Sequence, residues 1–111
     1  MRKNTESHLK SEILRVIGAR SDCRVWNAPV GQAWTRTGAP VRFGLKGCAD
    51  IIGVWRRYVP YTHGIFLAIE CKSDIGKQRP EQVAFERMVR EFGGVYILAR
   101  SVQDVLEVLD K

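Results

Sequence analysis

Two charged residues stand where they could take part in hydrolytic chemistry. Glu70 and Lys72 are two residues apart at the end of an apolar run, residues 65–69. Because side chains alternate along a strand, both would project from one face and Cys71 from the other. An acid-x-lysine triplet arises by chance about once in a chain of this size, and a solvated sheet edge or a simple ion pair would also explain it. The triplet alone does not decide the function.

Asp50 supplies a second carboxylate at the start of the preceding apolar segment. If the two segments form an antiparallel hairpin that turns near residues 60 and 61, residue 50 lies opposite residue 70 or 71. Facing carboxylates repel each other unless a cation lies between them, and carboxylate oxygens suit Mg²⁺ or Mn²⁺. The hairpin therefore predicts a divalent-metal site at one of its ends.

Glu6 and Gln82 occupy the first turns of two expected helices. Each falls on the apolar stripe of its helix, three and seven residues before apolar positions. Side chains there can reach past the core to a site at its edge. The alternatives stay open: an acid favoured by the helix dipole for Glu6, and a plain exposed residue for Gln82.

A divalent ion, two carboxylates and a lysine suit phosphodiester hydrolysis. The ion would lower the pKa of a bound water, and Lys72 would orient that water or stabilise the negative charge of the transition state. The chain has 18 Lys and Arg against 12 Asp and Glu, a net charge of +6, which favours polyanionic partners.

Several basic residues are candidates for nucleic-acid contact. Arg36, Arg42 and Lys46 accompany Trp34 in a segment expected to be a long loop, residues 29–47, with a poorly formed hairpin at most. A solvated loop with the tryptophan packed underneath explains this segment equally well. Lys77 and Arg79 follow the Glu70 strand and are better placed for phosphate contact.

Apolar periodicity locates the elements that would position these residues in one domain, residues 1–111. The pattern predicts helices over 5–19, 80–92 and 102–109, and strands over 23–28, 49–55, 65–72 and 95–99. Asn4 or Thr5 would cap the first helix, and the second would direct Phe85, Met88, Val89 and Phe92 inward. The order αβββαβα predicts an α/β or α+β fold with helices packed on a mixed sheet.

Cysteine usage and hydropathy exclude other classes. Cys23, Cys48 and Cys71 have no Cys-x-x-Cys spacing, so neither a zinc finger nor a disulfide framework is expected, and the thiols suit small buried apolar positions. No apolar run approaches the roughly 20 residues of a membrane span, and no signal-peptide core follows the first residues. A cytoplasmic protein is expected.

The sequence resembles the PD-(D/E)xK nuclease superfamily and, within it, the VRR-NUC family, which includes stand-alone phage and bacterial nucleases. The resemblance covers nearly the whole chain and rests on these segments: Glu6, Gly47-Cys48-Ala49-Asp50, Glu70-Cys71-Lys72, Gln82 and Gly93-Gly94-Val95-Tyr96. Ala49 stands where proline is usual in the family, which removes a turn preference but no ligand.

The resemblance implies a restriction-endonuclease-like core and a ligand set. Asp50, Glu70 and the backbone carbonyl of Cys71 would bind the metal, Glu6 would contact the metal or its water, and Gln82 would lie beside the site. It also implies a homodimer, and two sites related by two-fold symmetry would suit branched DNA, as in Holliday junction resolvases.

The sequence thus predicts a Mg²⁺- or Mn²⁺-dependent DNA endonuclease without a small-molecule cofactor, in a bacterial or phage-infected cell. A catalytically silent nucleic-acid-binding module of the same fold is the alternative. A structural protein with an edge ion pair is the third interpretation, and it predicts no affinity for divalent metals.

Overall fold

The computed structural model describes residues 5–57 and 63–111, in which three helices and six strands are present. They are α1 (Glu6–Gly18), β1 (Cys23–Asn27), β2 (Gly31–Trp34), β3 (Pro40–Phe43), β4 (Ile51–Trp55), β5 (Ile65–Cys71), α2 (Pro80–Glu91), β6 (Val95–Ala99) and α3 (Val102–Leu109). Among them no helix combines the length and the apolar character needed to cross a membrane. The expected turn near residues 60 and 61 and the candidate cap Asn4 lie outside the described residues.

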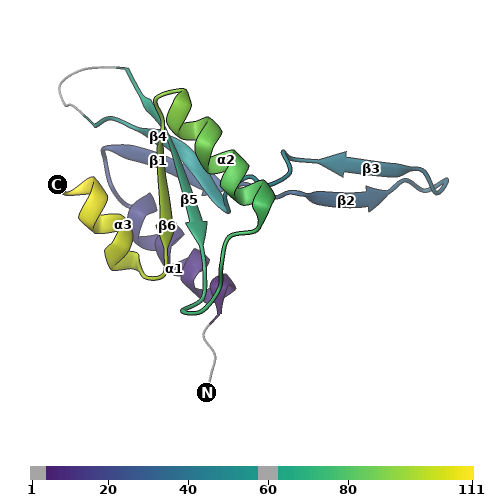
Figure 1. Ribbon diagram of the computed structural model, residues 1–111, viewed down its shortest axis with the longest axis horizontal. Helices are drawn as coiled ribbons and strands as arrows, with labels where there is room; N and C mark the ends of the chain where they lie inside the picture. Colours follow the sequence, from purple (N-terminus) through teal and green to yellow (C-terminus); the bar gives the residue numbers. More distant parts are fainter. Residues whose placement is uncertain (1–4, 58–62) are drawn as a thin grey trace.

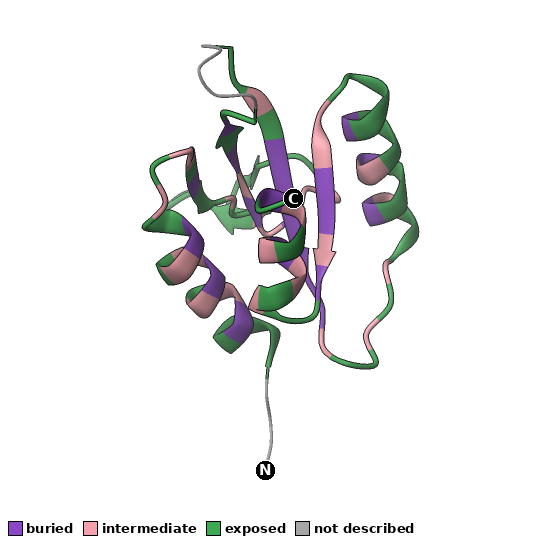
Figure 2. Cartoon of the chain, turned by 90° about the vertical axis from the view of Figure 1, so that its left-hand side faces the viewer, coloured by how far each residue is buried: buried purple, intermediate pink, exposed green. Residues whose placement is uncertain are grey.

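Four of the strands form a mixed central sheet in the order β1-β4-β5-β6. The first two pairs are antiparallel, whereas β5 and β6 are parallel and are connected through α2. Helix α2 packs on one face of the sheet, and α1 and α3 lie on the other face (Figures 1 and 2). The mixed α+β class is confirmed, and the expected order αβββαβα is observed once β2 and β3 are set aside.

Two separate hydrophobic cores lie on the two faces of this sheet. The larger core joins α1 and α3 to the sheet and includes Leu67, Ile69 and Cys71 of β5. The smaller core lies beneath α2 and includes Ala68 of the same strand. Because successive residues of β5 face different cores, Glu70 must project toward α2.

Local sequence explains where the helices begin. Thr5 caps α1 by accepting a hydrogen bond from the His8 amide at 3.1 Å, and Ser101 caps α3 through the Asp104 amide at 3.3 Å. Pro80 is the first residue of α2, a position where its missing amide hydrogen costs no hydrogen bond.

The inward face of α2 was predicted only in part. Phe85 and Val89 are buried as expected, and the ring of Phe85 packs edge-on against Tyr96. Met88 and Phe92 are exposed, so their assignment to the core is wrong. Phe92 follows the last turn of α2 and is 84% exposed, because the short helix ends before this residue can reach the sheet.

The segment over residues 29–47 is better ordered than the sequence predicts. Strands β2 and β3 pair over four positions, and their connecting turn is closed by a hydrogen bond from the Thr35 amide to the Ala39 carbonyl at 2.8 Å. This hairpin, residues 31–43, projects away from the sheet and is called the arm below (Figure 1). Nearly all of its residues are exposed, so it lacks the polar–apolar alternation from which strands are predicted.

The three cysteines are free. Cys71 is fully buried in the larger core, where burial raises the pKa of its thiol to about 12, so it is the apolar filler that was expected. Cys23 and Cys48 are half-buried.

Candidate active site

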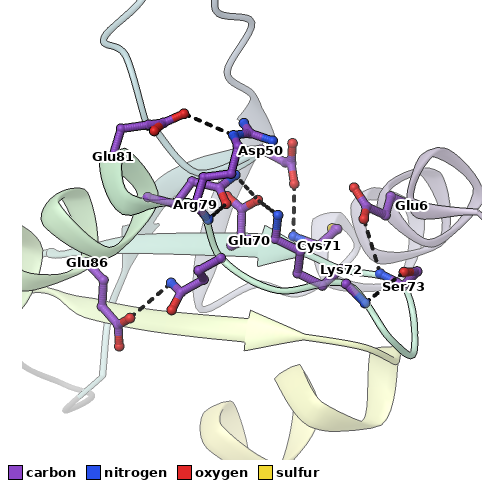
Figure 3. A network of polar contacts seen from close by, with 12 residues as sticks. Glu6, Asp50, Glu70, Cys71, Lys72, Ser73, Arg79, Glu81 and Glu86 are labelled. Atoms are coloured by element: carbon purple, nitrogen blue, oxygen red, sulfur yellow. Dashed lines mark hydrogen bonds and ion pairs between the residues drawn. The ribbon is translucent and has the colours of Figure 1, made fainter.

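The hairpin of β4 and β5 brings the two carboxylates to one end of the sheet. Ile51 pairs with Ile69, so the next position along the ladder sets Asp50 opposite Glu70. The Asp50 Oδ2 atom accepts a hydrogen bond from the Cys71 amide at 2.9 Å (Figure 3). The predicted hairpin is therefore confirmed, and of the two predicted partners, residues 70 and 71, the structure sets residue 70 opposite Asp50.

Glu70 is the most unusual residue of the site, because a carboxylate is rarely buried without full hydrogen bonding. Its side chain lies between the sheet and the first turn of α2, and the residue is 2% exposed. The Oε2 atom accepts a hydrogen bond from Gln82 Nε2 at 2.8 Å. The Oε1 atom is buried, and no donor within the described part of the chain reaches it.

Both polar atoms of the Gln82 side-chain amide form hydrogen bonds. While Nε2 donates to Glu70, Oε1 accepts from the Arg79 amide at 2.9 Å and so completes the start of α2. Gln82 is therefore a buried contact of Glu70, and its alternative interpretation as a plain exposed residue is wrong.

Lys72 lies on the same face as Glu70, as strand alternation predicts. Its Nζ is 3.8 Å from Glu70 Oε2, and the residue is 5% exposed. The aliphatic stem runs along Gly76, where a Cβ would lie 3.5 Å from Lys72 Cδ. The lysine is thus an interior cation beside the Glu70 carboxylate, which excludes a solvated sheet edge as the explanation of the triplet.

Burial and charge together make the ionised Glu70 unfavourable. Desolvation is the main cause, and the neighbouring Asp50 adds to it, so the pKa of Glu70 is raised to about 7 although Lys72 opposes the shift. A further cation at this position would relieve the repulsion between the two carboxylates.

Glu6 lies to one side of this pair. Its Oε2 accepts a hydrogen bond from the Ser73 amide at 3.2 Å, and it approaches the turn that contains Gly76 (Figure 3). In residues 5–57 and 63–111 no three Asp, Glu, His or Cys side chains gather into a metal-binding group. The structure therefore brings together Asp50 and Glu70, and Glu6 lies near enough to contribute to the raised pKa of Glu70 while its own carboxylate binds the Ser73 amide.

The donors that are present still fit one hard cation. Asp50 and Glu70 offer carboxylate oxygens, the Glu70 Oε1 atom has no other described partner, and the main chain of Cys71 lies between the two acids. Oxygen ligands of this kind are preferred by Mg²⁺ and Mn²⁺, which commonly retain several waters.

A cleft of about 570 Å³ adjoins Asp50 and Gln82. Lys46 and Arg79, two of the expected nucleic-acid contacts, line it, and Arg79 is paired with Glu81 at 2.9 Å. Of the other three, Lys77 lies in the exposed segment after β5, Arg42 on β3 and Arg36 in the turn of the arm.

The cleft also contains residues that the sequence did not single out. Lys10 lines it from α1, and Phe43 lines it from the end of the arm. Lys10 lies one helical turn after Glu6, on the same side of the helix, and this spacing was the available signal. Nothing in the sequence indicated Phe43, because its place depends on how the arm joins the sheet.

Comparison of the chain with protein-family models, with curated proteins and with solved structures finds no match in any of the three.

Proposed function

We propose that the protein is a Mg²⁺- or Mn²⁺-dependent DNA nuclease of the VRR-NUC type with a restriction-endonuclease-like core. The observation that supports this most is the buried Glu70, which faces Asp50, contacts Lys72 and retains one oxygen without a described hydrogen-bond donor. Such an arrangement is costly for stability alone, and perturbed, partly unsatisfied groups of this kind cluster at functional sites.

Asp50, Glu70 and the Cys71 carbonyl would hold the ion, which when bound would activate water and screen negative charge on the phosphate. Lys72 stands beside the carboxylates, where its ammonium group would stabilise charge on the phosphate or orient the attacking water. Gln82 holds Glu70 in place, and Lys46 and Arg79 would bind the DNA backbone along the cleft.

A catalytically silent DNA-binding module remains the alternative. It would use the same basic cleft but would have no need for a buried lysine beside the buried Glu70. The intact Asp50, Glu70 and Lys72 favour an enzyme over this alternative.

The deciding experiment is a cleavage assay with matched variants. Labelled linear, flapped, splayed and four-way DNA is incubated with wild type, Asp50→Asn and Lys72→Met in Mg²⁺, in Mn²⁺ and in excess EDTA. Wild type is expected to cut at least one substrate only with metal, and both variants are expected to lose on the order of 10²–10³-fold in rate.

Glu107→Gln and Lys111→Met make the same kinds of change at exposed positions in or after α3, and both should cut like wild type. Equal cutting by all five proteins would exclude this site. Binding of DNA without cutting by wild type would support the silent module, and the absence of any divalent-metal affinity would support the structural interpretation.

A homodimer is part of the same proposal. Trp26, Val54 and Phe66 are exposed on the face of the sheet that carries α2, and Val54 pairs with Phe66 across β4 and β5. An apolar patch of this kind is typical of an interface. Wild type is expected to behave as a dimer in light scattering and Phe66→Lys as a monomer, whereas a monomeric wild type would contradict the proposal.

A further inference from the structure

The arm exposes large side chains that neither core uses. Trp34 is 66% exposed, and Val41 and Phe43 are also exposed, while no residue of the arm belongs to either hydrophobic core. The alternative in which Trp34 packs underneath a loop is therefore wrong. Exposed aromatic groups on a projecting hairpin need another reason to be there, and contact with a partner supplies one.

The charge of this region identifies the kind of partner. Residues 28–49 contain Arg36, Arg42 and Lys46 and no Asp or Glu. The arm and its root therefore carry only positive charge, although the chain as a whole has 12 acidic residues. This is complementary to a polyanion such as the DNA backbone.

The two faces of the arm differ in chemistry. Gln32 pairs with Arg42 and Trp34 pairs with Pro40, so an amide, a guanidinium and an indole share one face. The other face carries small and apolar side chains, among them Val41. Arginine and glutamine are the side chains that bind guanine and adenine edges in the major groove, and that groove is wide enough for a two-stranded β-ribbon.

The root of the arm is fixed to the catalytic end of the sheet. The Ala28 amide donates to the Asp50 carbonyl at 2.9 Å, and Phe43 lines the cleft beside Asp50. After the arm the chain returns through Gly47, which has a φ of 84° and lies so close to the Glu81 carbonyl that a Cβ would be 2.2 Å from it. A duplex whose backbone enters the cleft therefore lies close to the arm.

We infer that the arm is a DNA-reading element that enters the major groove of duplex DNA next to the cut site, with Gln32, Trp34 and Arg42 as the contacting residues. The position of the arm in the reaction rests on the proposed nuclease function, whereas groove binding itself does not. The arm would select which phosphate reaches Asp50 and Glu70, because its root is hydrogen-bonded to the Asp50 main chain.

The test measures binding separately from cutting. Fluorescence anisotropy of a labelled duplex about three helical turns long is followed in Ca²⁺, an oxygen-binding cation, for wild type and for the double variant Gln32→Ala/Arg42→Ala. The double variant is expected to bind at least about tenfold more weakly, because two base-edge contacts are lost. The slope of log K against log salt concentration should stay close to that of wild type, because base-edge contacts do not neutralise phosphates.

Val41→Thr changes the opposite face of the same strand and is expected to bind like wild type. Methylation of guanine N7, which lies in the major groove, should weaken the binding of duplex by wild type and should not affect binding by the double variant.

Four other outcomes bear on the two proposals. If wild type binds through the arm but cuts no DNA, the nuclease proposal fails and the arm inference stands. If wild type cuts and the double variant binds and cuts equally well, the arm inference is overturned. It is also overturned if wild type does not bind duplex, or if the double variant changes the molar mass in light scattering, because the arm would then hold a second copy of the chain.

Discussion

Replacing Glu70 by glutamine is expected to abolish cleavage and at the same time to stabilise the metal-free protein. The substitution keeps the shape of the side chain and the acceptor for Gln82, but it removes the buried negative charge that faces Asp50. Cleavage should fall on the order of 10³-fold, because the site loses a metal ligand.

The gain in stability depends on pH in a defined direction. The pKa of Glu70 is raised from an ordinary value of 4.5 to about 7, so the folded protein holds this proton more tightly than the unfolded chain. The associated stability is therefore fully present below pH 4.5 and is lost as the pH rises through 7. Above pH 7 the wild type should be less stable than Glu70→Gln by up to about 3 kcal/mol, and the difference should shrink toward pH 5.

Urea denaturation at pH 5 and pH 8 in EDTA measures this difference. Glu91→Gln, an exposed substitution at the end of α2, should show no such dependence. Addition of Mn²⁺ should raise the melting temperature of wild type but not that of Glu70→Gln, because only a ligand that binds the native state stabilises it. A wild type that gains stability between pH 5 and pH 8 relative to the variant would contradict the burial argument.

Substitution of Gly53 by alanine should unfold the protein or come close to doing so. Gly53 lies in the middle of β4, where an added Cβ would be 2.0 Å from the Arg24 carbonyl oxygen and 2.8 Å from Val25 Cα. These are backbone atoms of the paired strand β1, so no side-chain rotation can relieve the contact. We expect a loss of more than about 3 kcal/mol in the free energy of unfolding.

Gly18→Ala is the matched control, because its Cβ would meet nothing within 4 Å at the end of α1. That variant should be unchanged or more stable by about 0.5–1 kcal/mol, since alanine favours the helix. Denaturant midpoints of the two variants make the comparison, and equal midpoints would show that β1 and β4 can separate at little cost.

The elements of the core were predictable from sequence because each one buries a face. The alternation along β5 and the stripes of α1 and α3 follow from contact with the two cores. The partner of Asp50 followed to within one residue, since placing the turn near residues 60 and 61 left residue 70 or 71 opposite it. The grouping of Asp50, Glu70, Lys72 and Gln82 at one end of the sheet was therefore predictable, and their role in catalysis stays a prediction.

The features that could not be predicted depend on contacts that produce no periodic pattern in the sequence. The arm has no buried face, so its strands resemble a loop in sequence. Glu6 lies on the apolar stripe of α1, as predicted, but its carboxylate accepts a hydrogen bond from the Ser73 amide. This contact depends on the path of the chain after β5, which the sequence pattern does not show. The burial of Glu70 likewise depends on where α2 begins.

The arm is joined to the rest of the protein only at its root, and its side chains add nothing to either hydrophobic core. Substitutions on its exposed face should therefore cost little stability. If the arm reads DNA as we infer, replacement of Gln32 or Arg42 would change the target while Asp50, Glu70 and Lys72 stay as they are. Target preference and the proposed chemistry would then be separable by mutation.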